Sequence, residues 1–121
     1  MLGGSDPDKL KAMLADNAVF HSPVVHTPQA GKAKVFAYLH AAAHVLGNDS
    51  FTYEREIIDG NTAMLEFALE LDGIQVNGVD IIRWNDAGLI EDFKVMVRPM
   101  KAMNKVWEKM GEMLAQSPPS S

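Results

Sequence analysis

The sequence predicts a single α+β domain in which a curved antiparallel sheet wraps around helices. Apolar residues at helical spacing mark the two ends of the chain, and four runs with alternating apolar and polar residues lie between 51 and 98. Asp-Gly pairs and similar turn signals separate these runs, which predicts successive hairpins and therefore an antiparallel meander. The 121 residues suit one domain over 1–121, with flexible ends at 1–5 and 116–121.

The first element is predicted to be a short helix over 7–15. Asp6 is a favourable N-cap and Pro7 suits the first helical position, while apolar residues at helical spacing follow. Residues 18–21 then read as a short extended segment.

A proline-containing loop and a longer helix come next. Pro23 and Pro28 exclude a helix from 22–31, which is therefore predicted to be an ordered loop. Apolar residues at helical spacing predict a second helix over 32–46, and Gly47 is a typical C-terminal stop.

The strands of the meander are predicted from alternation and from the turns between them. They are 51–58, 62–71, 74–84 and 89–98. Pro99 ends the last strand and can open a final helix over 100–115, whose apolar residues form one stripe.

Composition excludes several classes of function. A net charge of −5 with 11 dispersed basic residues argues against a nucleic-acid partner, because phosphate contacts need clustered cations. The absence of cysteine excludes disulfides, thiolate catalysis and zinc–thiolate sites. No phosphate-binding glycine loop, signal peptide or membrane-spanning stretch is recognisable. We therefore expect a cytoplasmic protein without a cofactor or a membrane partner.

Alternation also predicts which side chains face inward. Residues on the inner faces of the strands, together with Phe20, are expected to line an apolar ligand pocket. They are Phe20, Leu65, Phe67, Val76, Ile82, Phe93, Val95 and Val97. Asp80 is the one ionisable residue on this inner face.

The opposite rows mix apolar residues with charges of both signs. Met64, Val79, Ile81 and Met96 fall on this outer face among acidic and basic residues. Such a face suits a homodimer formed through the sheet. The alternative is a solvated face whose ion pairs contribute little to stability.

Asp80 is the strongest candidate for a functional residue. An apolar surrounding disfavours the charged carboxylate, so the pKa of Asp80 should rise and the neutral acid could donate a hydrogen bond to a ligand carbonyl. The alternative is a structural carboxyl satisfied by a backbone amide, by Tyr38 or Tyr53, or by Trp84.

The histidines give weaker signals. His21 or His26 could act as a base beside Ser22 in the proline loop, although surface histidines are the simpler interpretation. His40 and His44 have the i, i+4 spacing of metal ligands, but no third ligand is recognisable and no metal site is predicted.

Three segments resemble one family. They are LADNAVFHSP at 14–23, DIIRWNDAGLI at 80–90 and VMVRPMKA at 95–102. They are similar to the nuclear transport factor 2-like superfamily, and the last one to its SnoaL-like branch. The resemblance implies a cone-shaped, cystatin-like α+β barrel, and it places Asp80 where ketosteroid isomerases keep the protonated aspartic acid of their oxyanion hole.

The family's catalytic machinery is incomplete in this chain. Ser22 stands where the isomerases have their general-base aspartate, and Met64, Glu66 and Val95 stand near the catalytic positions of the epoxide hydrolases. The resemblance therefore implies binding of a small apolar molecule, with isomerase or cyclase chemistry on a cyclic carbonyl compound if there is turnover. The alternative is a non-catalytic dimerisation or partner-binding module, like the transport-factor members.

Overall fold

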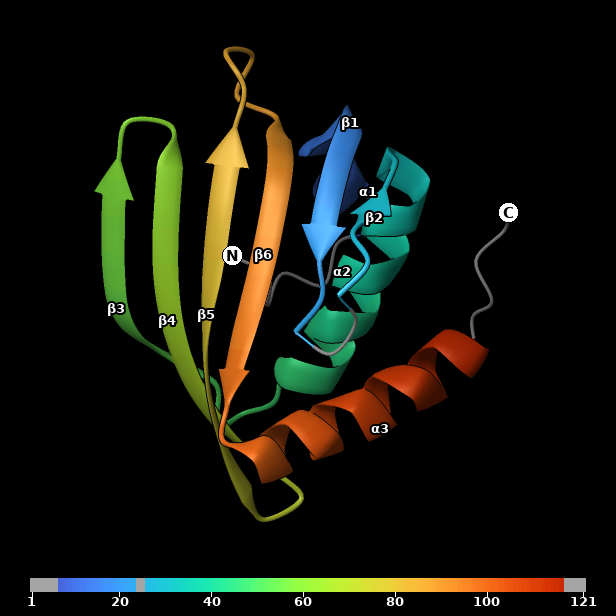
Figure 1. Ribbon diagram of the computed structural model, residues 1–121, viewed down its shortest axis with the longest axis vertical. Coiled ribbons are helices and arrows are strands. Elements are labelled where there is room, and N and C mark those ends of the chain that lie inside the picture. Colours follow the sequence, from blue (N-terminus) through green and yellow to red (C-terminus); the bar gives the residue numbers. More distant parts are fainter. Residues whose placement is uncertain (1–6, 24–25, 117–121) are drawn as a thin grey trace.

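The computed structural model describes residues 7–23 and 26–116. The predicted flexible ends at 1–5 and 116–121 lie outside this part of the chain except for Gln116, which is the last residue of the final helix. Helices and strands follow one another as Figure 1 shows. Their bounds are α1 Pro7–Ala12, β1 Leu14–His21, β2 Gln29–Ala30, α2 Lys32–Leu46, β3 Thr52–Asp59, β4 Thr62–Leu71, β5 Ile74–Trp84, β6 Ile90–Arg98 and α3 Met100–Gln116. None of the helices described is long and apolar enough to span a membrane.

The strands described form one open, mixed sheet in the order β2-β1-β6-β5-β4-β3. Strands β3 to β6 are the predicted antiparallel meander, and β4 pairs with β5 along its full length from Thr62 to Leu71. The expectation of a purely antiparallel sheet is wrong at one junction, because β1 runs parallel to β6 with Phe20 opposite Phe93. The sheet remains open, with β2 and β3 as its edges (Figure 1).

The first helix is shorter than predicted. It ends at Ala12, and the residues expected in its last turn begin β1. Leu14 lies opposite Ile90 of β6, and the Ile90 amide donates a hydrogen bond to the Met13 carbonyl at 2.8 Å. A partner more than 70 positions away in the chain therefore overrides the local helical spacing.

The proline loop also contains more structure than predicted. Gln29 and Ala30 form β2, which pairs with β1. Gly31 follows with a φ of 104°, and its amide donates to the Ala18 carbonyl at 2.9 Å. This positive φ favours glycine. The turn lets the chain pass from β2 directly into α2, whose bounds match the prediction.

The core lies between the inner face of the sheet and helices α2 and α3. Phe67, Val76 and Phe93 are buried almost completely, as alternation predicts. Helix α2 packs beside β1, while α3 contacts β5, β6 and α2 (Figure 1). The two helices thus cover the concave side of the sheet and leave its other side uncovered in the described chain.

Candidate functional site

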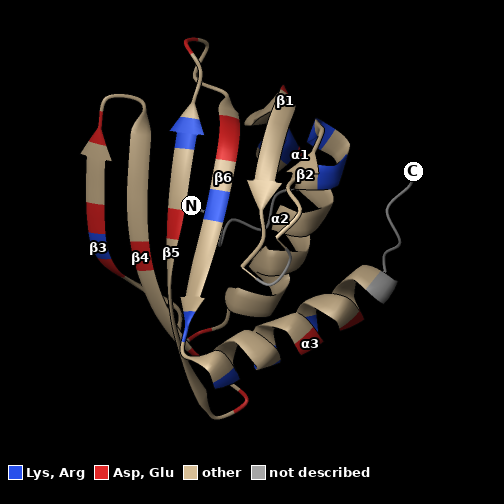
Figure 2. Ribbon diagram, viewed as in Figure 1, with Lys and Arg blue, Asp and Glu red and all other residues tan. Residues whose placement is uncertain are grey.

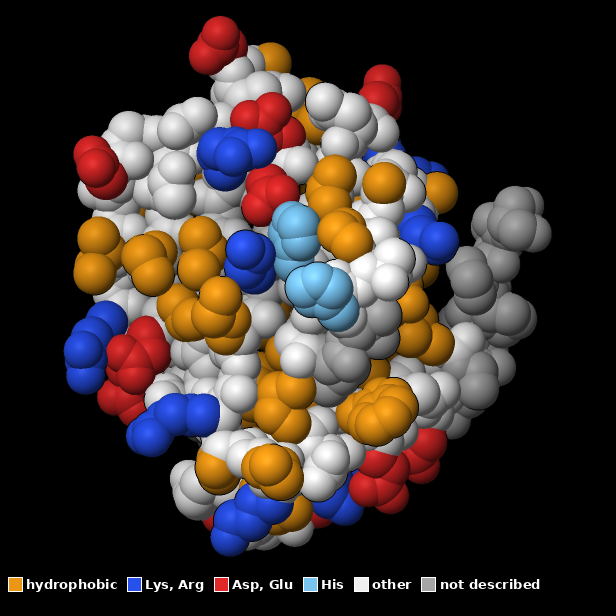
Figure 3. Space-filling model, viewed as in Figure 1, with side chains coloured by type: hydrophobic (Ala, Val, Ile, Leu, Met, Phe, Trp, Pro, Cys, Tyr) orange, Lys and Arg blue, Asp and Glu red, His pale blue; other side chains and the backbone are white. Residues whose placement is uncertain are grey.

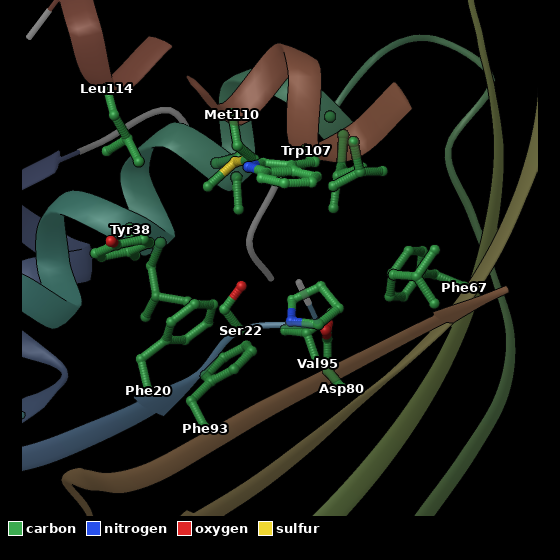
Figure 4. Close-up of a pocket in the computed structure, with 18 of the residues that line it drawn as sticks. Phe20, Ser22, Tyr38, Phe67, Asp80, Phe93, Val95, Trp107, Met110 and Leu114 are labelled. Carbon is green, nitrogen blue, oxygen red and sulfur yellow. The ribbon is translucent and has the colours of Figure 1, made fainter. Parts of the chain in front are cut away.

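A cavity of about 170 Å³ lies between the inner face of the sheet and the helices α2 and α3 (Figure 4). The sheet supplies its floor, while α2 and α3 supply its walls and cover. Its lining residues are Phe20, Ser22, Pro23, Tyr38, Leu39, Ala42, Ala43, Leu46, Gly47, Phe51, Phe67, Asp80, Phe93, Val95, Val97, Val106, Trp107, Met110, Gly111 and Leu114. Most of these residues are apolar, so the cavity suits an apolar ligand.

Aromatic rings make up much of the wall. Phe20 from β1 stacks on Tyr38 from α2 with ring centroids 5.6 Å apart, and its centroid lies 6.1 Å from that of Phe93 on β6. Phe51 and Phe67 stack with centroids 5.4 Å apart. Rings held against one another in this way present a rigid surface to a planar ligand.

A glycine in β5 makes room for one of these rings. Gly78 lies opposite Phe67, and a Cβ atom added there would collide with the Phe67 ring and lie 2.8 Å from the Met96 carbonyl oxygen. Glycine at this position therefore allows Phe67 to lie flat against the inner face of the sheet.

Asp80 lies on the central strand β5, two residues after Gly78 on the same face. It is 3% exposed and lines the cavity. Burial raises the pKa of its carboxyl from 3.8 to about 7, because an apolar surrounding disfavours the ionised form. A substantial fraction of Asp80 is therefore the neutral acid near pH 7, which can donate a hydrogen bond.

None of the described side chains that a purely structural role would need holds this carboxyl. In the described part of the chain, Asp80 makes no side-chain hydrogen bond and no ion pair, whether to Tyr38, Tyr53 or Trp84. No fully buried side-chain oxygen or nitrogen described is without a partner. Because Asp80 lines the cavity, a ligand in the cavity can reach its carboxyl.

Other polar groups at the cavity come from three different elements. Ser22 follows β1, Tyr38 is on α2, and Trp107 is on α3. Figure 4 shows the Ser22 hydroxyl and the Asp80 carboxyl on the sheet side, with the Trp107 ring on the opposite side. The structure thus places Ser22 and Asp80 at one cavity.

Five of the eight residues predicted to line a ligand pocket border this cavity. Phe20, Phe67, Phe93, Val95 and Val97 line the cavity. Leu65, Val76 and Ile82 do not line it, since they pack into the hydrophobic core. Alternation identifies the inward-facing residues. It does not distinguish the residues that pack in the core from those that line the cavity.

His21 lies away from the cavity. Its Nε2 atom pairs with an Asp92 carboxylate oxygen at 2.9 Å on the outer side of the sheet. With His26 and Lys94 it borders a separate shallow depression. The structure therefore does not bring His21 together with Asp80 in the cavity, because Phe20 and His21 alternate on β1.

The second histidine pair lies along α2. The rings of His40 and His44 meet edge to face with centroids 4.7 Å apart, and His40 also stacks on Phe36. Among the residues that the structure describes, no group of three or more His, Cys, Asp or Glu side chains could hold a metal ion.

Sequence reasoning missed the helical half of the wall. Tyr38 and Ala43 of α2, and Trp107, Met110 and Leu114 of α3, all line the cavity. The apolar stripe of the last helix was the available signal, and it indicated a buried face without showing what the face covers.

The outer face of the sheet has a different character. Acidic and basic residues are interspersed on its strands (Figure 2), and a row of hydrophobic side chains crosses β3, β4 and β5 between them (Figure 3). Ile57, Met64 and Ile81 lie side by side in the strand register, and Val79 lies opposite Met96. These five residues are called the outer apolar band below.

Comparisons with known proteins agree with this fold. The model of the SnoaL-like domain family matches residues 1–93. A steroid delta-isomerase from Pseudomonas aeruginosa is 38% identical, with a TM-score of 0.88, over 95% of this chain and 84% of that chain. A bacterial protein with a cystatin-like fold from Silicibacter pomeroyi is 28% identical, with a TM-score of 0.88, over 97% and 82% of the two chains.

A nuclear transport factor 2-like protein of unknown function from Mesorhizobium loti shares the fold alone, at 24% identity and a TM-score of 0.67 over 78% of this chain and 80% of that chain. A comparison with curated proteins gives no match. The family match covers most of the chain, and the likeness to the Pseudomonas isomerase extends over nearly all of it. The protein therefore belongs to the SnoaL-like domain family and has the nuclear transport factor 2-like fold.

Proposed function

We propose that this protein binds a small cyclic carbonyl compound in the cavity, and that neutral Asp80 donates a hydrogen bond to the carbonyl oxygen. One observation carries the proposal: a buried acid without a partner in the described chain opens into a cavity with aromatic walls. The likeness to a steroid delta-isomerase supports a ring compound as the ligand.

Among the described lining residues, a hydrogen-bond donor is easier to identify than a general base. Asp80 is the only carboxyl among the described lining residues, and no histidine is among them. A neutral acid beside the carbonyl oxygen polarises the C=O bond and stabilises negative charge on that oxygen. Isomerase or cyclase chemistry would also need a group that removes a proton from carbon. Ligand binding with carbonyl polarisation is therefore the function that these residues support best.

Prodan, a planar aromatic ketone with environment-sensitive fluorescence, can test this role of Asp80. Asp80→Leu removes the donor and should weaken prodan binding by about 3- to 10-fold, the usual effect of one neutral hydrogen bond. Asp80→Asn keeps a neutral donor and should bind prodan at every pH from 5 to 9. Fluorescence titrations measure both dissociation constants.

Binding to the wild-type protein should depend on pH. Only protonated Asp80 can donate, so affinity should be constant well below pH 7 and should fall as the pH rises through the pKa of about 7. The outer-face variant Asp92→Asn is the matched control and should titrate like the wild type. The proposal would be wrong if Asp80→Leu bound prodan as the wild type does.

We also propose that the outer apolar band mediates a homodimer through the sheet, which is the form that a partner-binding function would take. Ile57 is 59% exposed, Met96 51% and Met64 39%. Neighbouring apolar side chains on an uncovered sheet face favour association with an equivalent face. The ion pairs Arg55–Glu66 and Arg83–Glu91 lie on the same strands and can set the orientation.

Two adjacent isoleucines provide a matched test of the dimer. Ile57 and Ile58 are 59% and 61% exposed but lie on opposite faces of β3. Ile57→Lys should convert the dimer to a monomer, because it places a charge within the buried band. Ile58→Lys should leave the dimer intact. Sedimentation velocity measures both, and a monomeric wild type or equal behaviour of the two variants would contradict the proposal.

A further inference from the structure

The cavity reaches the surface at one identifiable place. Of its described lining residues, three are exposed: Gly47 at the end of α2, and Trp107 and Gly111 in α3. The others are buried or half-buried. The cavity therefore opens to solvent between the C-terminal end of α2 and the middle of α3.

The two glycines at this opening have different explanations. The Gly47 amide donates to the Ala43 carbonyl at 2.9 Å, and a Cβ on Gly47 would lie 2.5 Å from that same oxygen. Close packing against the backbone thus accounts for glycine at 47. Gly111 lies inside α3, and a Cβ there would meet nothing within 4 Å. Glycine inside a helix is unfavourable relative to other residues, so neither packing nor helix stability accounts for Gly111.

Trp107 lies one helical turn before Gly111 and therefore on the same side of α3. Its side chain is 60% exposed although it lines the cavity. Figure 4 shows its ring across the cavity from Asp80 and Val95. The large aromatic ring thus borders the opening on one side, and the bare backbone of Gly111 continues that border.

The helix that carries both residues is fastened to the sheet. Lys109 pairs with Asp72 in the turn between β4 and β5 at 3.0 Å, and Lys105 lies 3.8 Å from the same carboxylate. Val106 and Met110 of the same helix are buried in the core, so packing also holds α3 in place around Trp107. Access to the cavity therefore depends on the Trp107 side chain more than on movement of the whole helix.

We infer that Trp107 and Gly111 form the entrance to the cavity, with Gly111 as the position that limits which ligands can pass. The ligand passes over the bare backbone at Gly111, and the Trp107 ring moves aside and then covers the bound ring. This inference rests on the proposed function in one respect only, since both require that the cavity accepts an apolar ring compound.

Fluoronaphthalene tests the entrance without involving Asp80, because it has a planar ring and no carbonyl. Fluorine NMR exchange measures its association and dissociation rates. Gly111→Leu should slow both rates by about tenfold or more, since added side-chain atoms crowd the opening. The dissociation constant should change much less than the rates. Trp107→Ala should accelerate both rates.

The variants also separate an entrance effect from a folding effect. Leucine favours a helix over glycine, so Gly111→Leu should unfold at the same or a higher temperature than the wild type. Asn104→Leu places a leucine at an exposed position of α3 that does not line the cavity, and it should exchange like the wild type.

The outcomes distinguish this inference from the proposed function. Equal exchange rates for Gly111→Leu and the wild type, or no entry of fluoronaphthalene into the wild type, would overturn the entrance. Slow exchange in Gly111→Leu combined with prodan binding that ignores Asp80 would keep the entrance and overturn the role proposed for Asp80.

Discussion

The two faces of the sheet treat carboxyl groups in opposite ways. On the outer face, Glu66 pairs with Arg55 at 2.9 Å and Glu91 pairs with Arg83 at 3.1 Å. On the inner face, Asp80 is 3% exposed and has no partner in the described chain. Arg83 and Asp80 are only three positions apart on β5, and the strand turns one outward and the other inward.

The difference shows that environment, and not residue type, determines what a carboxyl does in this protein. An exposed carboxylate beside a cation contributes little to stability. A carboxyl in an apolar cavity destabilises the fold once it ionises, because burial penalises its charge. An acid kept in a position that opposes stability is typical of a functional site.

The largest expected effect comes from removing the inner carboxyl. Asp80 ionises near pH 4 in the unfolded chain and at about 7 in the folded protein. Between these pH values, Asp80 binds more protons in the folded state than in the unfolded chain. Its contribution to stability is therefore fully present below about pH 4 and is lost as the pH rises through 7. Asp80→Asn removes this loss and should stabilise the protein at pH 8 by up to about 4 kcal/mol.

Urea denaturation of both proteins at several pH values measures this effect. The difference in free energy of unfolding should be greatest at pH 8 and should shrink toward pH 4. A difference that does not change with pH would mean that Asp80 has an ordinary pKa in the folded protein.

The second effect concerns the shape of the inner face. Gly78→Ala places a methyl group against the Phe67 ring and the Met96 backbone oxygen. One of them must shift, which should destabilise the protein by about 1–3 kcal/mol. Thermal denaturation measures the loss, and prodan binding should weaken with it because Phe67 is a cavity wall. Full stability in this variant would show that the sheet can bend away from the ring.

The smallest effect is expected on the outer face. Glu91→Gln makes the same kind of carboxyl-to-amide change as Asp80→Asn, but it removes the negative charge from the exposed pair with Arg83. It should destabilise the protein by less than about 1 kcal/mol, and added salt should reduce the difference. Urea denaturation at low and high salt measures it. If Glu91→Gln and Asp80→Asn changed the free energy of unfolding in the same direction at pH 8, the contrast between the two faces would be wrong.

The sequence was sufficient to predict the meander and the inward position of Asp80. Alternation has a period of two residues, and the Asp72-Gly73 turn fixes the register between β4 and β5, so each side chain could be assigned to a face. Asp72 and Gly73 indeed adopt positive φ values of 51° and 82°.

The remaining features depend on contacts that no local pattern records. Leu14 fits a helix by its spacing but belongs to β1 because Ile90 is its partner. Leu65 and Phe67 have the same alternation, yet only Phe67 lines the cavity. Whether Trp107 lines a cavity depends on how α3 crosses the sheet, and this crossing is a property of the packed molecule. The position of the cavity therefore follows only from the three-dimensional structure.

The pKa of Asp80 is the most direct test of the contrast between the two faces. Carbon NMR of the side-chain carboxyl, with Asp80→Asn to assign the signal, measures it in the folded protein across pH 3–10. A midpoint at about 7 is expected. A midpoint near the usual 3.8 would contradict the account, because it would mean that Asp80 is solvated or paired and is not available as a neutral donor.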